Sequence, residues 1–231
     1  VEATRPDLVF TSCEEFSVLR GVVLERYLSE GDRLSISVAQ VSNGDGVILR
    51  LRLLDAEGRA RYAARGFAER KGATLDILPE RPRGLARLER TVYDGVALFH
   101  GDAFQVIVGA PDIGDAGLEA TLQGSAARGW GAGSWATDPA LIDGALQLAL
   151  LWTCDAEGGA ALPTSVKSFR RFTRGLVSSD IRAILVGRER TADRSTSDLV
   201  LVDASGAAIA ELRGVEMHVL PGSRRSPSVR V

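Results

Sequence analysis

The sequence is poor in the residue types that define several common functional classes. It contains two cysteines, Cys13 and Cys154, and two histidines, His100 and His218. Two cysteines are too few for the disulfide framework of a small secreted protein, and together with the histidines they show no metal-ligand spacing. We therefore expect neither structural disulfides nor a metal site.

Lysine is also scarce: Lys71 and Lys167 are the only two among 28 basic residues, and the formal net charge is −2. This balance lacks the positive footprint of a nucleic-acid-binding protein. No stretch is long or apolar enough to span a membrane, and no secretory signal is present. The expected location is cytoplasmic, with neither nucleic acid nor membrane as a partner.

One segment is apolar almost throughout and nevertheless contains an acid. In Asp138-Pro-Ala-Leu-Ile-Asp-Gly-Ala-Leu-Gln147, Asp138 suits a helix N-cap and Pro139 the first helical position, which predicts a helix over 139–152. An apolar helix is normally buried, and burying Asp143 is costly unless the carboxyl group is neutralised or hydrogen-bonded. Gln147 lies one turn further along the same face. The alternative is that Asp143 reaches solvent at a frayed helix end.

An internal repeat runs through the sequence at a spacing of 148 residues. Leu54-Asp-Ala-Glu-Gly58 and Val202-Asp-Ala-Ser-Gly206 match at this spacing, and each is followed at the same distance by an Arg-Gly pair. Residues 32–38 and 180–186 match in the same register. Tight turns of the Asp-x-x-Gly type are common, but two matches in one register indicate a duplication.

The residues around these turns have the pattern of β-strands. Apolar and polar residues alternate over 34–38 and over 49–53, and 199–202 is a continuous apolar run. Each half is therefore expected to form an antiparallel sheet, and the second half also contains the predicted helix. This combination predicts an α+β fold of the double-hotdog class, in which two antiparallel sheets each wrap round a central helix.

The repeat also predicts the domain organisation. Shifting the helix at 139–152 back by one repeat places its counterpart almost entirely before Val1, so we expect the first hotdog to be truncated at its N-terminus. The predicted parts are the remainder of that hotdog (1–78), a linker rich in proline and charge (79–90), the C-terminal hotdog (91–220) and a flexible tail (221–231).

Three segments resemble the motifs of the dehydratase domains of polyketide synthases. The helical segment resembles the family motif His-Pro-x-x-x-Asp-x-x-x-Gln, and Leu98-Phe-His-Gly-Asp-Ala-Phe-Gln105 resembles Gly-Tyr-x-Tyr-Gly-Pro-x-Phe. Leu162-Pro-Thr-Ser-Val166 is similar to Leu-Pro-Phe-x-Trp. Order and spacing agree, and the resemblance covers about residues 16–220. The Leu-Phe-His-Gly variant is more similar to iterative synthases of the polyunsaturated-fatty-acid or enediyne type.

The departures from the family pattern concern the substrate site and the base. Asp138 replaces the usual His, Asp102 the usual Pro, and Thr164 and Val166 the usual Phe and Trp, which alters the shape of the expected substrate tunnel. The family's catalytic histidine lies in a His-x-x-x-Gly-x-x-x-x-Pro motif of the first hotdog, and residues 1–90 of this sequence contain no histidine. The repeat predicts that it belongs upstream of the first residue.

The resemblance implies removal of water from a β-hydroxyacyl thioester, giving an α,β-enoyl thioester. In that reaction the histidine takes the α-proton and Asp143 protonates the departing hydroxyl group, while Gln147 orients the acid or the hydroxyl. No cofactor is implied beyond the 4′-phosphopantetheine arm of an acyl carrier protein, which holds the substrate. The implied partners are that carrier protein and other synthase domains, and a homodimer through the synthase is allowed. The implied substrate-binding residues besides Gln147 are Phe99, His100, Gly101, Phe104 and Pro163.

Two other functions stay open at this stage. A related double-hotdog enzyme, such as a product-template cyclase or a double-bond isomerase, would keep the same acid in a differently shaped cavity. A non-catalytic dehydratase-like scaffold within a megasynthase is the second alternative. His100 is favoured as pocket lining over a role as substitute base, because a lone histidine between aromatic residues is usually packed and hydrogen-bonded.

Overall fold

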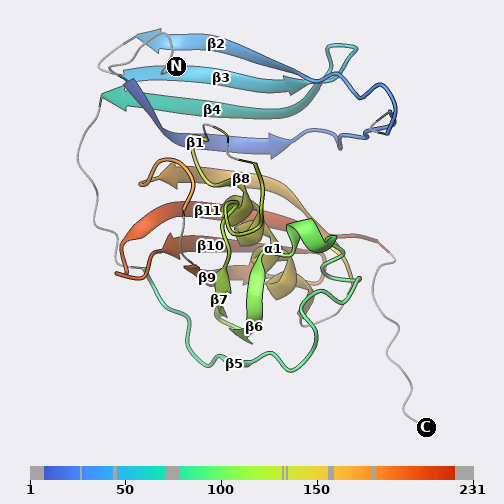
Figure 1. Ribbon diagram of the computed structural model, residues 1–231, viewed down its shortest axis with the longest axis vertical. Helices are drawn as coiled ribbons and strands as arrows, with labels where there is room; N and C mark the ends of the chain where they lie inside the picture. The colour runs from blue at the N-terminus through green and yellow to red at the C-terminus, as the bar shows by residue number, and fades with distance from the viewer. Residues whose placement is uncertain are drawn as a thin grey trace.

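The computed structural model describes residues 8–26, 28–43, 46–70, 79–131, 133, 135–155, 159–177 and 180–221. These residues form an antiparallel sheet of eleven strands in the order β2-β3-β4-β1-β8-β11-β10-β9-β7-β6-β5, with the helix α1 (Pro139–Asp155) and the short 3₁₀ helix η1 (Asp102–Phe104) (Figure 1). The strands are β1 (Leu8–Val18), β2 (Ser35–Asn43), β3 (Gly46–Leu54), β4 (Ala60–Arg70), β5 (Ala86–Arg87), β6 (Ile107–Gly114), β7 (Gly117–Leu122), β8 (Ala161–Arg171), β9 (Ile181–Arg190), β10 (Arg194–Val202) and β11 (Ala208–Val219).

The pairing of β1 with β8 joins two groups of strands into one sheet. Outward from this pair, the order is β1-β4-β3-β2 on one side and β8-β11-β10-β9 on the other. The β3–β4 and β10–β11 hairpins occupy equivalent places, and their turns have the same hydrogen bonds. Asp55 Oδ1 accepts the Arg59 N–H at 2.8 Å, and Asp203 Oδ1 accepts the Ala207 N–H at 3.0 Å. Gly58 and Gly206 supply the positive φ, at 76° and 89°.

The second group of strands curves round α1, which contacts β6, β7, β8, β9, β10 and β11 (Figure 1). The core lies between the helix and this part of the sheet. Its largest fully buried side chains include Leu141, Leu148, Leu151 and Trp152 from α1. The helix is buried on nearly every side, as its apolar sequence predicts.

The predicted start of the helix at Pro139 is confirmed, but the helix ends at Asp155 instead of Trp152. Thr153 is polar, yet it continues the helix because its hydroxyl group has buried partners. Its Oγ1 donates to Ala149 O at 2.6 Å and lies 2.6 Å from Ser195 Oγ of β10. Cys154 is also buried, with 2% of its surface exposed.

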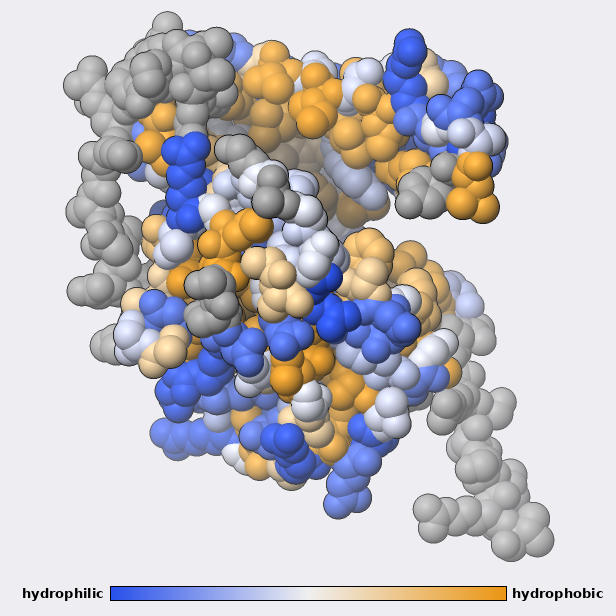
Figure 2. Space-filling view, in the orientation of Figure 1, coloured by the Kyte–Doolittle hydropathy of each residue, from blue (hydrophilic) through white to orange (hydrophobic). Residues whose placement is uncertain are grey.

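The expectation that one face of residues 34–38 is buried is wrong in the described part of the chain. Leu34, Ile36 and Val38 are 39%, 74% and 55% exposed. β2 is an edge strand, and α1 packs on β6 to β11 instead of on this face. Hydrophobic residues accordingly gather at the β2–β4 end of the molecular surface (Figure 2).

The segment 79–90, which the sequence predicts as a linker, is partly built into the sheet. It contains β5, which pairs with β6, and Leu88 is buried in the core at 8% exposure. The predicted tail lies outside the described residues apart from Pro221. No helix in the described ranges is long and apolar enough to cross a membrane.

Gly187 of β9 gives a direct test of how α1 is packed on the sheet. A Cβ atom at this position would lie 2.2 Å from Trp152 Cζ2, so we expect Gly187→Ala to destabilise the fold by about 1–3 kcal/mol through overpacking. Urea unfolding followed by tryptophan fluorescence measures the change. Gly21→Ala is the matched control, because nothing lies within 4 Å of its Cβ position. Equal midpoints for the two variants would contradict the close packing.

Candidate active site

The helix that carries the candidate acid is fixed at its N-terminus by Asp138, which is 2% exposed. Its Oδ1 accepts hydrogen bonds from the Ala140 N–H at 3.1 Å and from Ser125 Oγ at 2.6 Å. Its Oδ2 accepts the Val177 N–H at 3.1 Å. Asp138 is therefore the N-cap that the sequence predicts, and it also ties two loops to the helix start. Gly124 makes room for it, because a Cβ there would lie 2.6 Å from Asp138 Oδ2.

Asp143 lies in the second turn of α1 and is half-buried. Gln147, one turn later, is fully buried and donates from Nε2 to Asp143 Oδ2 at 2.7 Å. The pairing expected from their spacing is thus present. The exposed, frayed-end alternative does not hold, because Asp143 is half-buried inside a helix that runs from Pro139 to Asp155.

Burial raises the pKa of the Asp143 carboxyl group above its ordinary value, against the opposing effects of the Gln147 hydrogen bond and nearby His100. Desolvation favours the neutral form of a carboxylic acid, so the environment of α1 moves Asp143 toward the protonation state that a proton donor needs. An ion pair with Lys or Arg would hold Asp143 ionised, and none is present among the described residues.

The position of Asp143 along the sheet depends on its neighbour Gly144. A Cβ at Gly144 would lie 2.9 Å from Val106 Cγ2 and 3.0 Å from Leu122 Cδ1. The helix backbone therefore approaches β7 and the residue before β6 more closely than any other side chain would allow. This close approach sets the depth at which the carboxyl group sits.

The Gln147 amide makes two further hydrogen bonds that sequence reasoning did not predict. Its Nε2 also donates to Phe104 O at 2.8 Å, and its Oε1 accepts the Tyr93 hydroxyl at 2.9 Å. The Tyr93 oxygen in turn accepts the Ile107 N–H at 2.9 Å. The sequence gives only a general indication of these contacts, since a tyrosine that is partly buried usually has a hydrogen-bond partner for its hydroxyl group.

The aromatic segment before η1 lies beside this cluster. His100 stacks on Phe99, with ring centroids 5.6 Å apart, and meets the edge of Tyr93 at 6.5 Å. Phe104 contributes its carbonyl group to Gln147, and its half-exposed ring packs against Trp130 at 5.0 Å. The structure thus brings Phe104 to Gln147 and His100 near Asp143, whereas Phe99 is 60% exposed and contacts His100.

The remaining two predicted substrate-binding residues lie outside the hydrogen-bonded cluster. Gly101 is exposed at the start of η1. Pro163 lies on β8 opposite Met217 of β11. Their roles in binding an acyl chain stay predictions.

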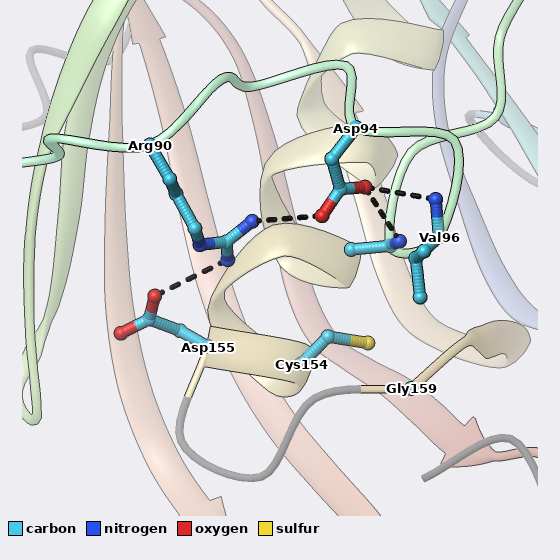
Figure 3. A pocket seen from close by; sticks show the side chains of 7 residues that line it. Arg90, Asp94, Val96, Cys154, Asp155 and Gly159 are labelled. Carbon is cyan, nitrogen blue, oxygen red and sulfur yellow. Dashed lines mark hydrogen bonds and ion pairs between the residues drawn. The ribbon is translucent and has the colours of Figure 1, made fainter. Parts of the chain in front are cut away.

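The segment that carries Tyr93 is attached to the C-terminal end of α1 (Figure 3). The Arg90 guanidinium lies between Asp94 and Asp155, at 3.3 Å from each. Asp94 Oδ1 also accepts the Val96 and Ala97 N–H groups at 2.8 and 2.9 Å. A small cavity of about 100 Å³ lies here, lined also by Cys154 and Gly159.

A larger and more open cavity, of about 400 Å³, is lined by residues 90–93 of the same segment. Its walls include Tyr93, Gln105 and Ile107, and Asp143 is not among its lining residues. An acid that acts on a bound substrate is expected to face a cavity, and for Asp143 this stays a prediction. Among the described residues, no group of three or more His, Cys, Asp or Glu side chains is arranged to hold a metal ion.

With this geometry in place, the comparison with protein families is decisive. The model of the polyketide synthase dehydratase N-terminal domain matches residues 75–227, which is more than half of the chain. The chain belongs to this family of polyketide synthase dehydratases. A comparison with curated proteins finds no match.

Solved structures share the fold at low sequence identity. The dehydratase domain of RzxB from Pseudomonas fluorescens is 14% identical with a TM-score of 0.64, covering 91% of this chain and 76% of that one. A trans-acyltransferase polyketide synthase enoyl-isomerase is 15% identical with a TM-score of 0.66, covering 94% and 84%. An inactive aspartate-to-asparagine mutant of the CurK dehydratase is 16% identical with a TM-score of 0.62, covering 91% and 76%.

We expect Asp138→Asn to destabilise the protein nearly as much as Asp138→Ala, by about 2 kcal/mol or more. One amide group cannot accept hydrogen bonds at both of its ends, so its Nδ2 would face either the Ser125 and Ala140 donors or the Val177 donor. Urea unfolding measures the loss. Asp115→Asn is the control, because its side chain is fully exposed beside Arg190 and should cost less than about 1 kcal/mol. A wild-type midpoint for Asp138→Asn would refute the two-sided role of the carboxylate.

Proposed function

We propose that this protein removes water from a β-hydroxyacyl thioester to give the α,β-enoyl thioester, with the acyl chain on the 4′-phosphopantetheine arm of an acyl carrier protein. The observation that carries the proposal is the half-buried Asp143, whose pKa is raised by burial and which accepts a hydrogen bond from the fully buried Gln147. Membership of the polyketide synthase dehydratase family supports the same reaction.

In this mechanism Asp143 acts as the general acid. Loss of the β-hydroxyl group as hydroxide is slow, and a proton delivered to the departing oxygen makes water the leaving group instead. A carboxyl group that is neutral near the working pH can supply that proton, whereas an exposed aspartate would already be ionised. An essential acid agrees with the aspartate-to-asparagine substitution in the CurK dehydratase, which is described as inactive.

The proton on the α-carbon requires a base on the other side of the substrate. The letters of the family's His-x-x-x-Gly-x-x-x-x-Pro motif occur in this sequence from His218 to Pro227, at the C-terminal end of the second hotdog, and not in residues 1–78, which contain no histidine. His218 lies on β11 and pairs with Glu216 at 2.8 Å, and His100 lies beside Tyr93 and near Asp143 itself. We propose that the base is a histidine from polypeptide outside this sequence, so that the residues described supply the acid half of the site.

A double hotdog is the fold that we propose for the intact domain. The mirrored strand order about β1 and β8 and the equivalent hairpin turns support it. The apolar face that includes Ile36 and Val38 would then pack against a second helix, as the other half packs against α1. The partners that fit this proposal are an acyl carrier protein and further synthase domains.

Double-bond isomerisation is the second candidate, because an enoyl-isomerase of a polyketide synthase is among the structures with this fold. That reaction moves a proton between the α- and γ-carbons of an enoyl chain and expels no hydroxyl group. One group that removes and returns the proton is therefore enough, and no neutral acid is needed to protonate a leaving group. The raised pKa of Asp143 favours dehydration, and incubation with a β-hydroxyacyl and an enoyl substrate distinguishes the two reactions.

We expect Asp143→Asn in the intact dehydratase domain to lower kcat by about 10²-fold or more, a typical loss for one positioned acid. Turnover is followed as the mass loss of water from the carrier-bound acyl chain. Asp115→Asn is the control and should keep activity within about twofold, because its side chain is fully exposed beside Arg190. Near-wild-type turnover of Asp143→Asn would exclude this residue as the proton donor and favour the scaffold alternative.

The same substitution should stabilise the protein at neutral pH. Because the folded-state pKa of Asp143 is raised, the neutral acid is favoured by folding, and this contribution is fully present below the unfolded pKa and lost as pH rises through the folded pKa. An uncharged amide side chain at this position would avoid the buried charge altogether. The gain in unfolding free energy from Asp143→Asn should thus be largest at pH 7 and vanish below about pH 4. A pH series of urea unfolding curves tests this, and a gain independent of pH would contradict the raised pKa.

A further inference from the structure

The hydrogen bonds around Gln147 form a chain whose two ends are backbone groups of fixed character. At one end the Ile107 N–H can only donate, and at the other end the Phe104 carbonyl oxygen can only accept. Between them lie the Tyr93 hydroxyl group and the Gln147 amide, each of which is able to donate and to accept. The ends therefore decide the direction of every hydrogen bond between them.

The direction follows one bond at a time. Since the Tyr93 oxygen accepts from Ile107, the tyrosine's own proton is free to donate to Gln147 Oε1 at 2.9 Å. The Gln147 nitrogen is then left to donate its two hydrogens, to Phe104 O at 2.8 Å and to Asp143 Oδ2 at 2.7 Å. The flipped amide would place Oε1 against the Phe104 oxygen and leave both oxygens without a donor, which disfavours it.

Tyr93 keeps its hydroxyl proton and lies in a segment that is anchored to α1. Burial raises its pKa to about 12, so the hydroxyl keeps its proton throughout the physiological range. Arg90 and Asp94, on either side of it in the sequence, attach this segment to Asp155 at the end of α1 (Figure 3). The hydroxyl group is thus placed at Gln147, about two helical turns before that anchor.

We propose that Tyr93 is a positioning residue, which fixes the orientation of the Gln147 amide and thereby assigns the transferable proton of Asp143 to Oδ1. Oδ2 accepts an N–H and so behaves as the carbonyl oxygen of the neutral acid, leaving Oδ1 as the oxygen that carries the proton. This assignment rests on the proposed dehydration for its catalytic consequence. The hydrogen-bond geometry on which it is based does not depend on that reaction.

Other titratable groups near Asp143 also affect its pKa and must stay unchanged in a test of the Tyr93 hydroxyl group. His100, from the segment before η1, interacts with the carboxyl group and favours its ionised form. Tyr93 is sensitive to the charges of Asp143 and Arg128. Because substitution of Tyr93 by phenylalanine leaves His100 and Arg128 in place, a change in Asp143 titration would report the amide orientation.

The test is Tyr93→Phe in the intact domain, with Asp143 titrated by carboxyl ¹³C NMR. Without the hydroxyl group Gln147 Oε1 loses its donor and the amide is held by Phe104 O alone, so its hydrogen bond to the ionised carboxylate weakens and we expect the Asp143 pKa to rise by about one pH unit. kcat should fall about tenfold with KM within about twofold, because the acid is misdirected while substrate binding is kept. The alkaline limb of the kcat profile should move to higher pH with the pKa of the acid.

Tyr62→Phe is the matched control. Tyr62 lies on β4 and packs against Phe16 of β1, away from this cluster. The substitution should change neither the Asp143 titration nor kcat. An unchanged Asp143 pKa in folded Tyr93→Phe would overturn the positioning role. A shifted pKa in a protein whose wild type shows no dehydration would instead refute the proposed function and leave the positioning role intact.

Should Tyr93→Phe not fold, hydrogen exchange in the wild type decides the matter. Both Nε2 hydrogens of Gln147 are donated in the proposed orientation, so both should exchange more slowly than those of a solvent-exposed side-chain amide, as followed by ¹⁵N NMR. Rapid exchange of either hydrogen would overturn the assignment.

Discussion

The enclosure of α1 by the curved sheet is the constraint on which the rest of the structure depends. It supplies the hydrophobic core, through Leu148, Leu151 and Trp152, and the low-dielectric surroundings that make Asp143 a weak acid. These two roles oppose each other, since each carboxyl group placed in a core reduces its stability. The described residues limit the cost by providing one neutral hydrogen-bond donor, Gln147, and no ion pair with Lys or Arg. An arginine in that place would have stabilised the fold and abolished the neutral acid.

Asp138 and Asp143, five residues apart on the same helix, show how surroundings assign different roles to one residue type. Asp138 accepts hydrogen bonds from five groups, two of them backbone N–H groups of the first helical turn, where N–H donors are unpaired and the helix dipole favours an anion. Asp143 lies beyond the first turn, where backbone N–H groups are already used. The first aspartate is therefore a structural anchor and the second a candidate for chemistry.

The elements that could be predicted from the sequence are those governed by local rules. Pro139 and Asp138 mark a helix start, Asp55 and Asp203 mark tight turns, and the spacing of Asp143 and Gln147 predicts their contact. What could not be predicted depends on contacts between distant segments. Tyr93 lies 54 positions from Gln147, and nothing in its neighbours in the sequence indicates that pairing. The exposure of Ile36 likewise depends on which element covers a sheet face, which an alternating pattern cannot specify.

Gly144 has a consequence for how the site can change over evolutionary time. Because Val106 and Leu122 occupy the space beside it, the acid's neighbour can gain a side chain only if one of those two residues becomes smaller. Substitutions at these three positions should therefore be non-additive, each being tolerated or harmful according to the other two. The burial of Asp143 thus depends on the volumes of Val106 and Leu122, two apolar side chains that take no part in the chemistry.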